Sequence, residues 1–218
     1  AKFVNKKRRC IQKCLKGGRK NGGPYAECGA PYGGATAGCI QDAEKGAEAK
    51  ARARNARACA KECPACYDAG GNCPDGAGFV AAVETNVDQT DPLVHCLEAA
   101  GLTPTKAEAK CEDGVAKHLA KFAGSKGKCY DKCVDREFKG KIPAGSCTAG
   151  SPSDPDTQAC IQAAEDKAAG KIDDVCEPSG AKPACYPPER DSGADWVGVV
   201  ENLVDAQTRL VYCSSPRG

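Results

Sequence analysis

The chain has 218 residues, of which 17 are cysteine and none is methionine, and aromatic residues are scarce. Its 31 lysine and arginine residues nearly balance 29 aspartate and glutamate residues. A formal net charge of +2 does not indicate a nucleic-acid-binding protein. No apolar run approaches the ~20 residues that a membrane-spanning helix needs, so we predict no membrane span.

The cysteines occur twice in nearly the same order. Local sequence recurs with them, for example at residues 64–67 and 183–186. We therefore predict a tandem duplication, with repeat one over residues 1–100 and repeat two over residues 101–218. The recurring pairs are Cys10/Cys129, Cys14/Cys133, Cys28/Cys147 and Cys66/Cys185 at an offset of 119, and Cys39/Cys160, Cys59/Cys176 and Cys96/Cys213 at offsets of 121, 117 and 117.

The first half of repeat one predicts two helices. One runs from Phe3 to about Leu15 and ends at Gly17-Gly18, because glycine commonly follows the last turn of a helix. Its cluster Lys6-Lys7-Arg8-Arg9 is expected on a solvated helix face. The other helix is rich in Ala, Glu, Lys and Arg and runs from about Cys39 to Cys63.

A third helix is expected over residues 79–88 and again over residues 196–205, because apolar residues recur at i, i+1, i+4 and i+8. Asp91-Pro92 is expected to end the first copy, before a short extended segment that reaches Cys96. Both copies carry carboxylates at i, i+4, which we assign to the polar helix face rather than to a cation site. These are Glu84 with Asp88 and Glu201 with Asp205.

Repeat two opens with a marked helix start. The segment Thr105–Glu108 has the pattern of a capping box, and an apolar stripe predicts that the helix continues past its internal glycines to about Val134. Repeat one begins at the counterpart of Ala120, so it holds only the last part of this helix. A further helix is predicted from about Cys160 to Cys176.

Loops rich in Gly, Pro, Asn and Ser separate the helices, over residues 17–38, 67–78, 136–159 and 177–195. Loops of this length need tethers to stay ordered. That need gives a structural role to Cys28, Cys73, Cys147 and Cys185. The predicted fold is therefore all-α, a disulfide-stapled tandem duplication of helical hairpins with long tethered loops.

Antiparallel helices joined by a loop bring together residues whose numbers have a constant sum. Cys129 with Cys160 and Cys111 with Cys176 give nearly equal sums, so both pairs fit one hairpin register. Extending this pattern leaves Cys59 as a buried thiol or an intermolecular bond former. The predicted disulfides are Cys10–Cys39, Cys14–Cys28, Cys66–Cys96, Cys63–Cys73, Cys111–Cys176, Cys129–Cys160, Cys133–Cys147 and Cys185–Cys213.

We predict no catalytic, cofactor or metal site. The segment Cys63–Cys66 has CxxC spacing but follows a helix, and repeat two lacks its first cysteine, so a structural role is favoured over redox or zinc chemistry. Of the two histidines, His118 is expected at a solvated or core-edge position, and His95 aligns with Tyr212, which binds no metal. Nucleophile elbows, phosphate loops and HExxH motifs are absent.

The segments 107–133 and 160–169 carry Ala/Lys-rich sequence punctuated by Lys110-Cys111, Lys128-Cys129 and Cys160-Ile161-Gln162. They resemble a helical repeat of secreted proteins of delta-proteobacterial type. The resemblance covers about half of the chain. It implies a secreted, cysteine-stapled helical array and no particular activity.

Disulfides at this density persist in oxidising compartments, so we expect a secreted or cell-surface protein. A chain that starts at Ala1 without an apolar leader is expected to be a mature protein after removal of a signal peptide. The favoured function is a non-enzymatic structural protein that self-associates head to tail, as an extracellular filament subunit. The alternatives are a secreted monomeric binding module for a protein or glycan, and a thiol-based metal or redox protein.

Overall fold

The computed structural model describes residues 2–21, 25–60, 63, 76–97, 104–177 and 181–212. Every regular element within these residues is helical, as expected for an all-α fold. Two short 3-10 helices, Ala26–Cys28 and Pro188–Arg190, accompany the α-helices. These are α1 (Lys2–Asn21), α2 (Gly34–Gln41), α3 (Ala47–Cys59), α5 (Ala77–Val94), α6 (Lys106–Phe138), α7 (Pro155–Cys176) and α8 (Gly193–Tyr212).

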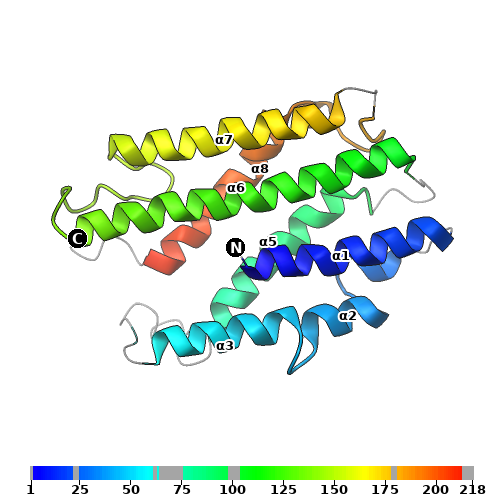
Figure 1. Cartoon of the computed structure of the whole chain (residues 1–218), viewed down its shortest axis with the longest axis horizontal. Helices are drawn as coiled ribbons and strands as arrows, with labels where there is room; N and C mark the ends of the chain where they lie inside the picture. Colours follow the sequence, from blue (N-terminus) through cyan, green and yellow to red (C-terminus); the bar gives the residue numbers. More distant parts are fainter. Residues whose placement is uncertain are drawn as a thin grey trace.

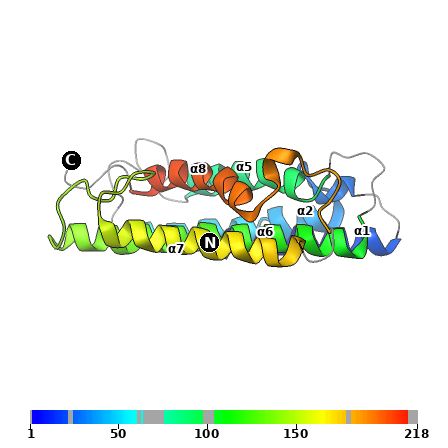
Figure 2. The ribbon, with the colours of Figure 1, turned by 90° about the horizontal axis from the view of Figure 1, so that it is seen from above.

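The helices form two layers. In the first layer, α7, α6 and α1 lie side by side, and α2 with α3 continues the layer beyond α1 (Figure 1). In the second layer, α5 and α8 cross one side of the first, as the view from above shows (Figure 2). The opposite side of α1, α6 and α7 is not covered by a described helix.

Helix α6 forms the centre of the first layer, and its start follows the predicted capping box. The Thr105 side chain accepts a hydrogen bond from the backbone N–H of Glu108, and the Glu108 carboxylate accepts one from the backbone N–H of Thr105. Helix α7 approaches closely at Gly114, where a Cβ atom would lie 2.6 Å from Val175. The apolar core between α6, α7 and α8 includes Leu119 and Trp196.

The end of α5 packs into this core of repeat two, although α5 belongs to repeat one. Val94 is buried in the same cluster as Leu119 and Trp196. The Tyr186 hydroxyl donates a hydrogen bond to the carbonyl oxygen of Val94 over 2.8 Å. Residues 1–100 and residues 101–218, the two predicted repeats, are therefore joined through the last turn of α5.

Two predicted boundaries in the first half of the chain are wrong. Helix α1 continues past Gly17-Gly18 to Asn21, and the ion pair of Arg19 with Glu112 of α6 holds its last turn. The predicted helix over 39–63 is broken into α2 and α3, because the Asp42 side chain accepts the backbone N–H groups of Glu44 and Lys45. Such a local turn competes with the helical hydrogen bonds.

The predicted end of α5 at Asp91-Pro92 is also wrong. The helix includes Pro92 and ends at Val94, and the segment expected to be extended is a turn in which Cys96 has a φ of 52°. Proline removes a single backbone donor this close to a helix end. Burial of Val94 and its hydrogen bond with Tyr186 offset that loss.

A buried lysine joins the layers in each repeat. Lys7 of α1 is 0% exposed, and its Nζ lies 2.6 Å from the carboxylates of both Glu84 and Asp88 on α5. The expectation that residues 6–9 form a solvated face is therefore wrong for Lys7. The i, i+4 carboxylates expected on a polar helix face hold this lysine instead.

The equivalent lysine of repeat two is Lys126 of α6, which is 1% exposed. Its Nζ lies 2.7 Å from Glu201 and 2.9 Å from Asp205, both on α8. Tyr130 also contacts the Asp205 carboxylate, and burial raises the pKa of this tyrosine to about 12. A lysine between two carboxylates thus joins α8 to α6, and an equivalent contact joins α5 to α1.

We predict that Lys126→Ala lowers the free energy of unfolding by about 3–5 kcal/mol, because it leaves two carboxylates without their buried partner. The control Lys128→Ala removes an exposed lysine from the same helix and should change it by no more than about 0.5 kcal/mol. Urea unfolding of the oxidised proteins, followed by circular dichroism, measures both. Equal effects would contradict a structural role for the buried lysine.

Candidate functional site

Five of the predicted disulfides are present. Two of them lie between α6 and α7, with Cα–Cα distances of 4.8 Å for Cys111–Cys176 and 5.9 Å for Cys129–Cys160, so the predicted hairpin register of repeat two is confirmed. The others tether α1 to α2 and secure two loops. They are Cys10–Cys39, Cys14–Cys28 and Cys133–Cys147.

The predicted pairs Cys66–Cys96 and Cys185–Cys213 are wrong, because Cys96 is bonded to Cys185. The last turn of α5 inserts beside Tyr186 and brings Cys96 to the loop of repeat two instead of to its own. This bond joins the repeats across a sequence separation of 89. Cys66 and Cys213 lie outside the described residues.

Cys63 takes part in a disulfide, but its predicted partner Cys73 lies outside the described residues. Cys59, at the end of α3, is the free cysteine in the described part of the chain, and it is half-buried. Its counterpart Cys176 is buried and bonded to Cys111 on the first half of α6. Helix α3 contacts α1, α2 and α5, and none of these supplies an equivalent of that half-helix beside Cys59.

A buried charged cluster lies beside the Cys96–Cys185 bond. The His95 side chain is fully buried, with Nε2 3.6 Å from Asp91 and Nδ1 3.8 Å from Glu112. Arg19 of α1 completes the cluster at 2.6 Å from Glu112. Sequence reasoning missed this cluster, although the departure from the repeat pattern at His95, where repeat two has Tyr212, was a signal for it.

The pKa of Asp91 is shifted by this environment. Burial raises its pKa to about 6, and the adjacent imidazole of His95 opposes the shift. One carboxylate oxygen of Asp91 has no hydrogen-bond partner. The ionised form of this side chain is therefore disfavoured in the folded protein.

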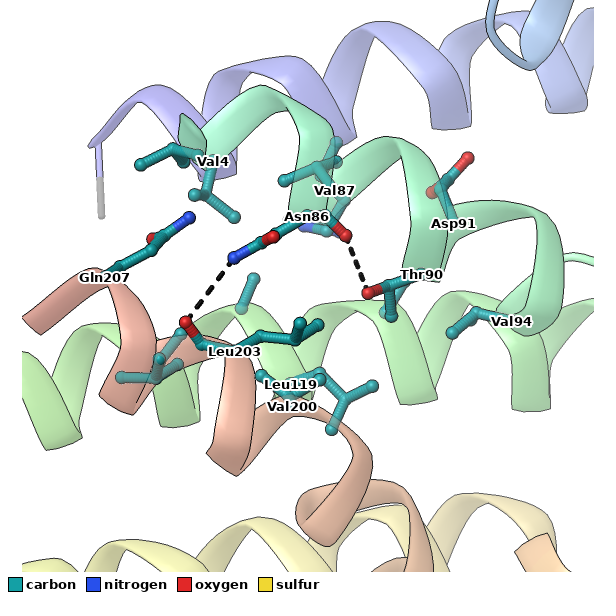
Figure 3. Close-up of a pocket in the computed structure, with 16 residues that line it drawn as sticks. Val4, Asn86, Val87, Thr90, Asp91, Val94, Leu119, Val200, Leu203 and Gln207 are labelled. Carbon is teal, nitrogen blue, oxygen red and sulfur yellow. Dashed lines mark hydrogen bonds between the residues drawn. The ribbon is translucent and has the colours of Figure 1, made fainter. Parts of the chain in front are cut away.

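A small apolar pocket lies where α1, α5, α6 and α8 meet (Figure 3). Its volume is about 90 Å³, and its walls are mainly valine, leucine and alanine side chains. Asn86 of α5 donates a hydrogen bond to the carbonyl oxygen of Leu203 on α8, and Gln207 donates one back to Ala82. An engineered cavity of about 150 Å³ accepts benzene, so this pocket is too small for a ligand of ordinary size.

His118 has no thiolate from Cys111 with which to bind a metal. Cys111, the thiol nearest to His118 in sequence, is bonded to Cys176. His118 is half-buried, and burial lowers its pKa, with Lys121 and Lys117 adding to the effect. Among the described residues, no three His, Cys, Asp or Glu side chains form a group that could hold a metal ion.

These features define an all-helical protein stapled by disulfides, with its polar chemistry concentrated at the contacts between helices. Comparison with models of protein families, with curated proteins and with solved structures gives no match. None of the helices in the described ranges is long and apolar enough to cross a lipid bilayer.

We predict that Asp91 makes the protein less stable as the pH rises from about 4 to about 6. Its folded-state pKa lies above its unfolded value, so the folded state holds the proton over this interval and the unfolded state does not. The loss should approach roughly 3 kcal/mol. Unfolding measured across this range for the wild type and for Asp91→Asn gives the contribution as a difference, and parallel pH profiles would contradict it.

Proposed function

We propose that this chain is an exported, non-enzymatic structural protein whose copies associate head to tail into an extracellular filament. The described disulfides support an oxidising compartment, since such bonds persist there. The observation that carries the proposal is the incomplete packing of α3, at the end of which Cys59 remains unpaired.

Helix α3 is covered far less than its counterpart α7. Ala47 is its one buried residue, whereas α7 buries Ile161, Ala168 and Ile172 together with two further side chains. Alanines on the second half of α3 are exposed. Small exposed side chains of this kind allow another helix to approach closely, which makes this half of α3 a suitable contact surface.

Charge complementarity indicates which surface of a second copy fits α3. The exposed charged side chains of α3 are all cations, namely Lys50, Arg52, Arg54 and Arg57. Exposed carboxylates gather around the end of α7 and the start of α8, at Asp174, Glu177, Glu189, Asp191 and Asp195. The end of α3 and the end of α7 lie at opposite corners of the molecule (Figure 1).

A contact between these two corners uses different surfaces on the two copies. Such heterologous contacts continue from copy to copy unless a rotation closes a ring, so they generate open assemblies. A bond between two Cys59 thiols would join identical surfaces and stop at a dimer. We therefore expect the ionic contact to propagate the filament and the Cys59 thiol to be enclosed within it.

A charge exchange tests this proposal. Arg54→Glu with Arg57→Glu should abolish assembly, and so should Glu177→Lys with Glu189→Lys, because each double variant places like charges at the contact. A mixture of the two variants restores opposite charges at every contact, so it should assemble into alternating filaments. Sedimentation velocity and electron microscopy at low ionic strength read out the result.

Lys139→Gln with Lys141→Gln is the control, since these lysines are exposed at the end of α6, away from both corners. It should assemble as the wild type does. A wild-type protein that stays monomeric at high concentration would sink the proposal and favour the binding module instead. Alkylation of native protein should label Cys59, and labelling should decrease when filaments form.

A further inference from the structure

The exposed face of α1 is almost entirely cationic. Helix α1 contains no acidic residue. Its exposed side chains are five cations and Asn21, and the cations recur along the helix so that they share one side. They are Lys2, Arg9, Lys13, Lys16 and Lys20.

Helix α6 repeats this pattern beside it. From its start to residue 128, its exposed side chains are five lysines and one serine. The carboxylates of this stretch are engaged elsewhere: Glu108 caps the helix, Glu112 is buried, and Asp113 lies 3.6 Å from Arg19. The five lysines are Lys106, Lys110, Lys117, Lys121 and Lys128.

The two rows lie on one side of the molecule. Helices α1 and α6 run next to each other in the first layer, and α5 and α8 cover their other side (Figures 1 and 2). Gln12 of α1 donates a hydrogen bond to the carbonyl oxygen of Asp113 on α6. The ten cations of α1 and α6 therefore form one surface, which we call the basic face.

Two shallow depressions lie on this face. One runs along the outer side of α1 between Arg9, Lys13, Lys16 and Lys20. The other, of about 390 Å³, lies along α6 and α7, where Lys167 and Lys171 of α7 join Lys121 and Lys128. Both depressions are lined by cations, and Lys171 is the one of these lysines with a described carboxylate partner, Asp174 at 2.8 Å.

Charges this close repel one another. Neighbours three or four residues apart in these rows lie about 5–6 Å apart at their Cβ atoms, which is within the screening length of about 8 Å at physiological ionic strength. The neighbours that are seven residues apart are separated by roughly 10 Å along the helix. The lysines around His118 already contribute to the lowering of its pKa. An anionic ligand that follows the rows would relieve this repulsion and release bound counterions.

We propose that the basic face binds a linear acidic polysaccharide, with carboxylate or sulfate groups of successive sugars on successive lysines. The cations follow one another at three or four residues or at seven residues, which at a rise of about 1.5 Å per residue corresponds to the length of one or of two pyranose rings. Lysine suits such a ligand, because its flexible point charge accepts anions at varying angles. The inference takes the extracellular setting from the proposed function and does not depend on filament formation.

Other polyanions fit this surface less well. Binding of single-stranded nucleic acid uses aromatic side chains on which bases stack, and neither cationic row contains one. Binding to an anionic membrane uses apolar residues beside the cations. The exposed large apolar residues in the described ranges are Leu93, Phe138 and Val211, and none belongs to either cationic row.

The experiment compares two variants with equal loss of charge. One replaces Lys13, Lys117 and Lys121 by Gln on the basic face, and the other replaces Lys139, Lys141 and Lys182 by Gln outside it. The probe is a fluorescent heparin fragment, with an oligogalacturonate of equal length as the carboxylate counterpart. Affinity is measured by fluorescence anisotropy at several salt concentrations, with circular dichroism to confirm folding.

The wild type should bind at physiological ionic strength, and the basic-face variant should bind about tenfold more weakly, whereas the control changes less than twofold. The slope of log affinity against log salt should decrease by about three for the basic-face variant. Equal losses in both variants would overturn the proposal. So would absence of binding to both glycans, or tighter binding to a DNA duplex of matched charge or to anionic vesicles.

Discussion

Two buried lysines fix the second layer of helices on the first. A lysine without water is stable only between opposite charges, so Lys7 determines where α5 lies on α1, and Lys126 determines where α8 lies on α6. Large apolar side chains are scarce in this chain, which has four Phe, one Trp and no Met, so packing alone gives these positions limited support. Disulfides join helices within the first layer, and the ion pairs add to the apolar contacts, such as those of Trp196, that hold the second layer on it. The repeated sequence thus repeats a charged contact as well as a set of cysteines.

The two predicted repeats pack into each other and do not form two independent hairpins. Val94 and Cys96 of repeat one reach the core and the Tyr186 loop of repeat two, and His95 between them lies against carboxylates. Register arithmetic could predict Cys111–Cys176, because both residues lie on helices joined by a loop. It could not predict Cys96–Cys185, because a duplicated cysteine has two equivalent partners and the choice depends on tertiary packing.

Local signals predicted what local interactions determine. The capping box at Thr105 and the heptad-like stripe of α6 identified a helix whose start the structure confirms. The break at Asp42 and the passage of α5 through Pro92 depend on a side-chain turn and on burial of Val94, which periodicity does not contain. The nearly neutral composition also concealed the basic face. Net charge is a sum over the chain, whereas binding depends on which side chains share a surface.

Positive and negative side chains are segregated between α1 and α5. Helix α5 carries carboxylates and no lysine or arginine, and α1 carries lysine and arginine and no carboxylate. The contact between them uses Lys7, and the outer cations of α1 have no carboxylate partner among the described residues. The cations of α3 form a separate set at one corner of the molecule, so a polysaccharide along α1 and α6 would leave that corner open. The two proposed contacts therefore use different residues, although salt weakens both of them. A filament built through α3 would present the basic faces of its copies as a repeating surface.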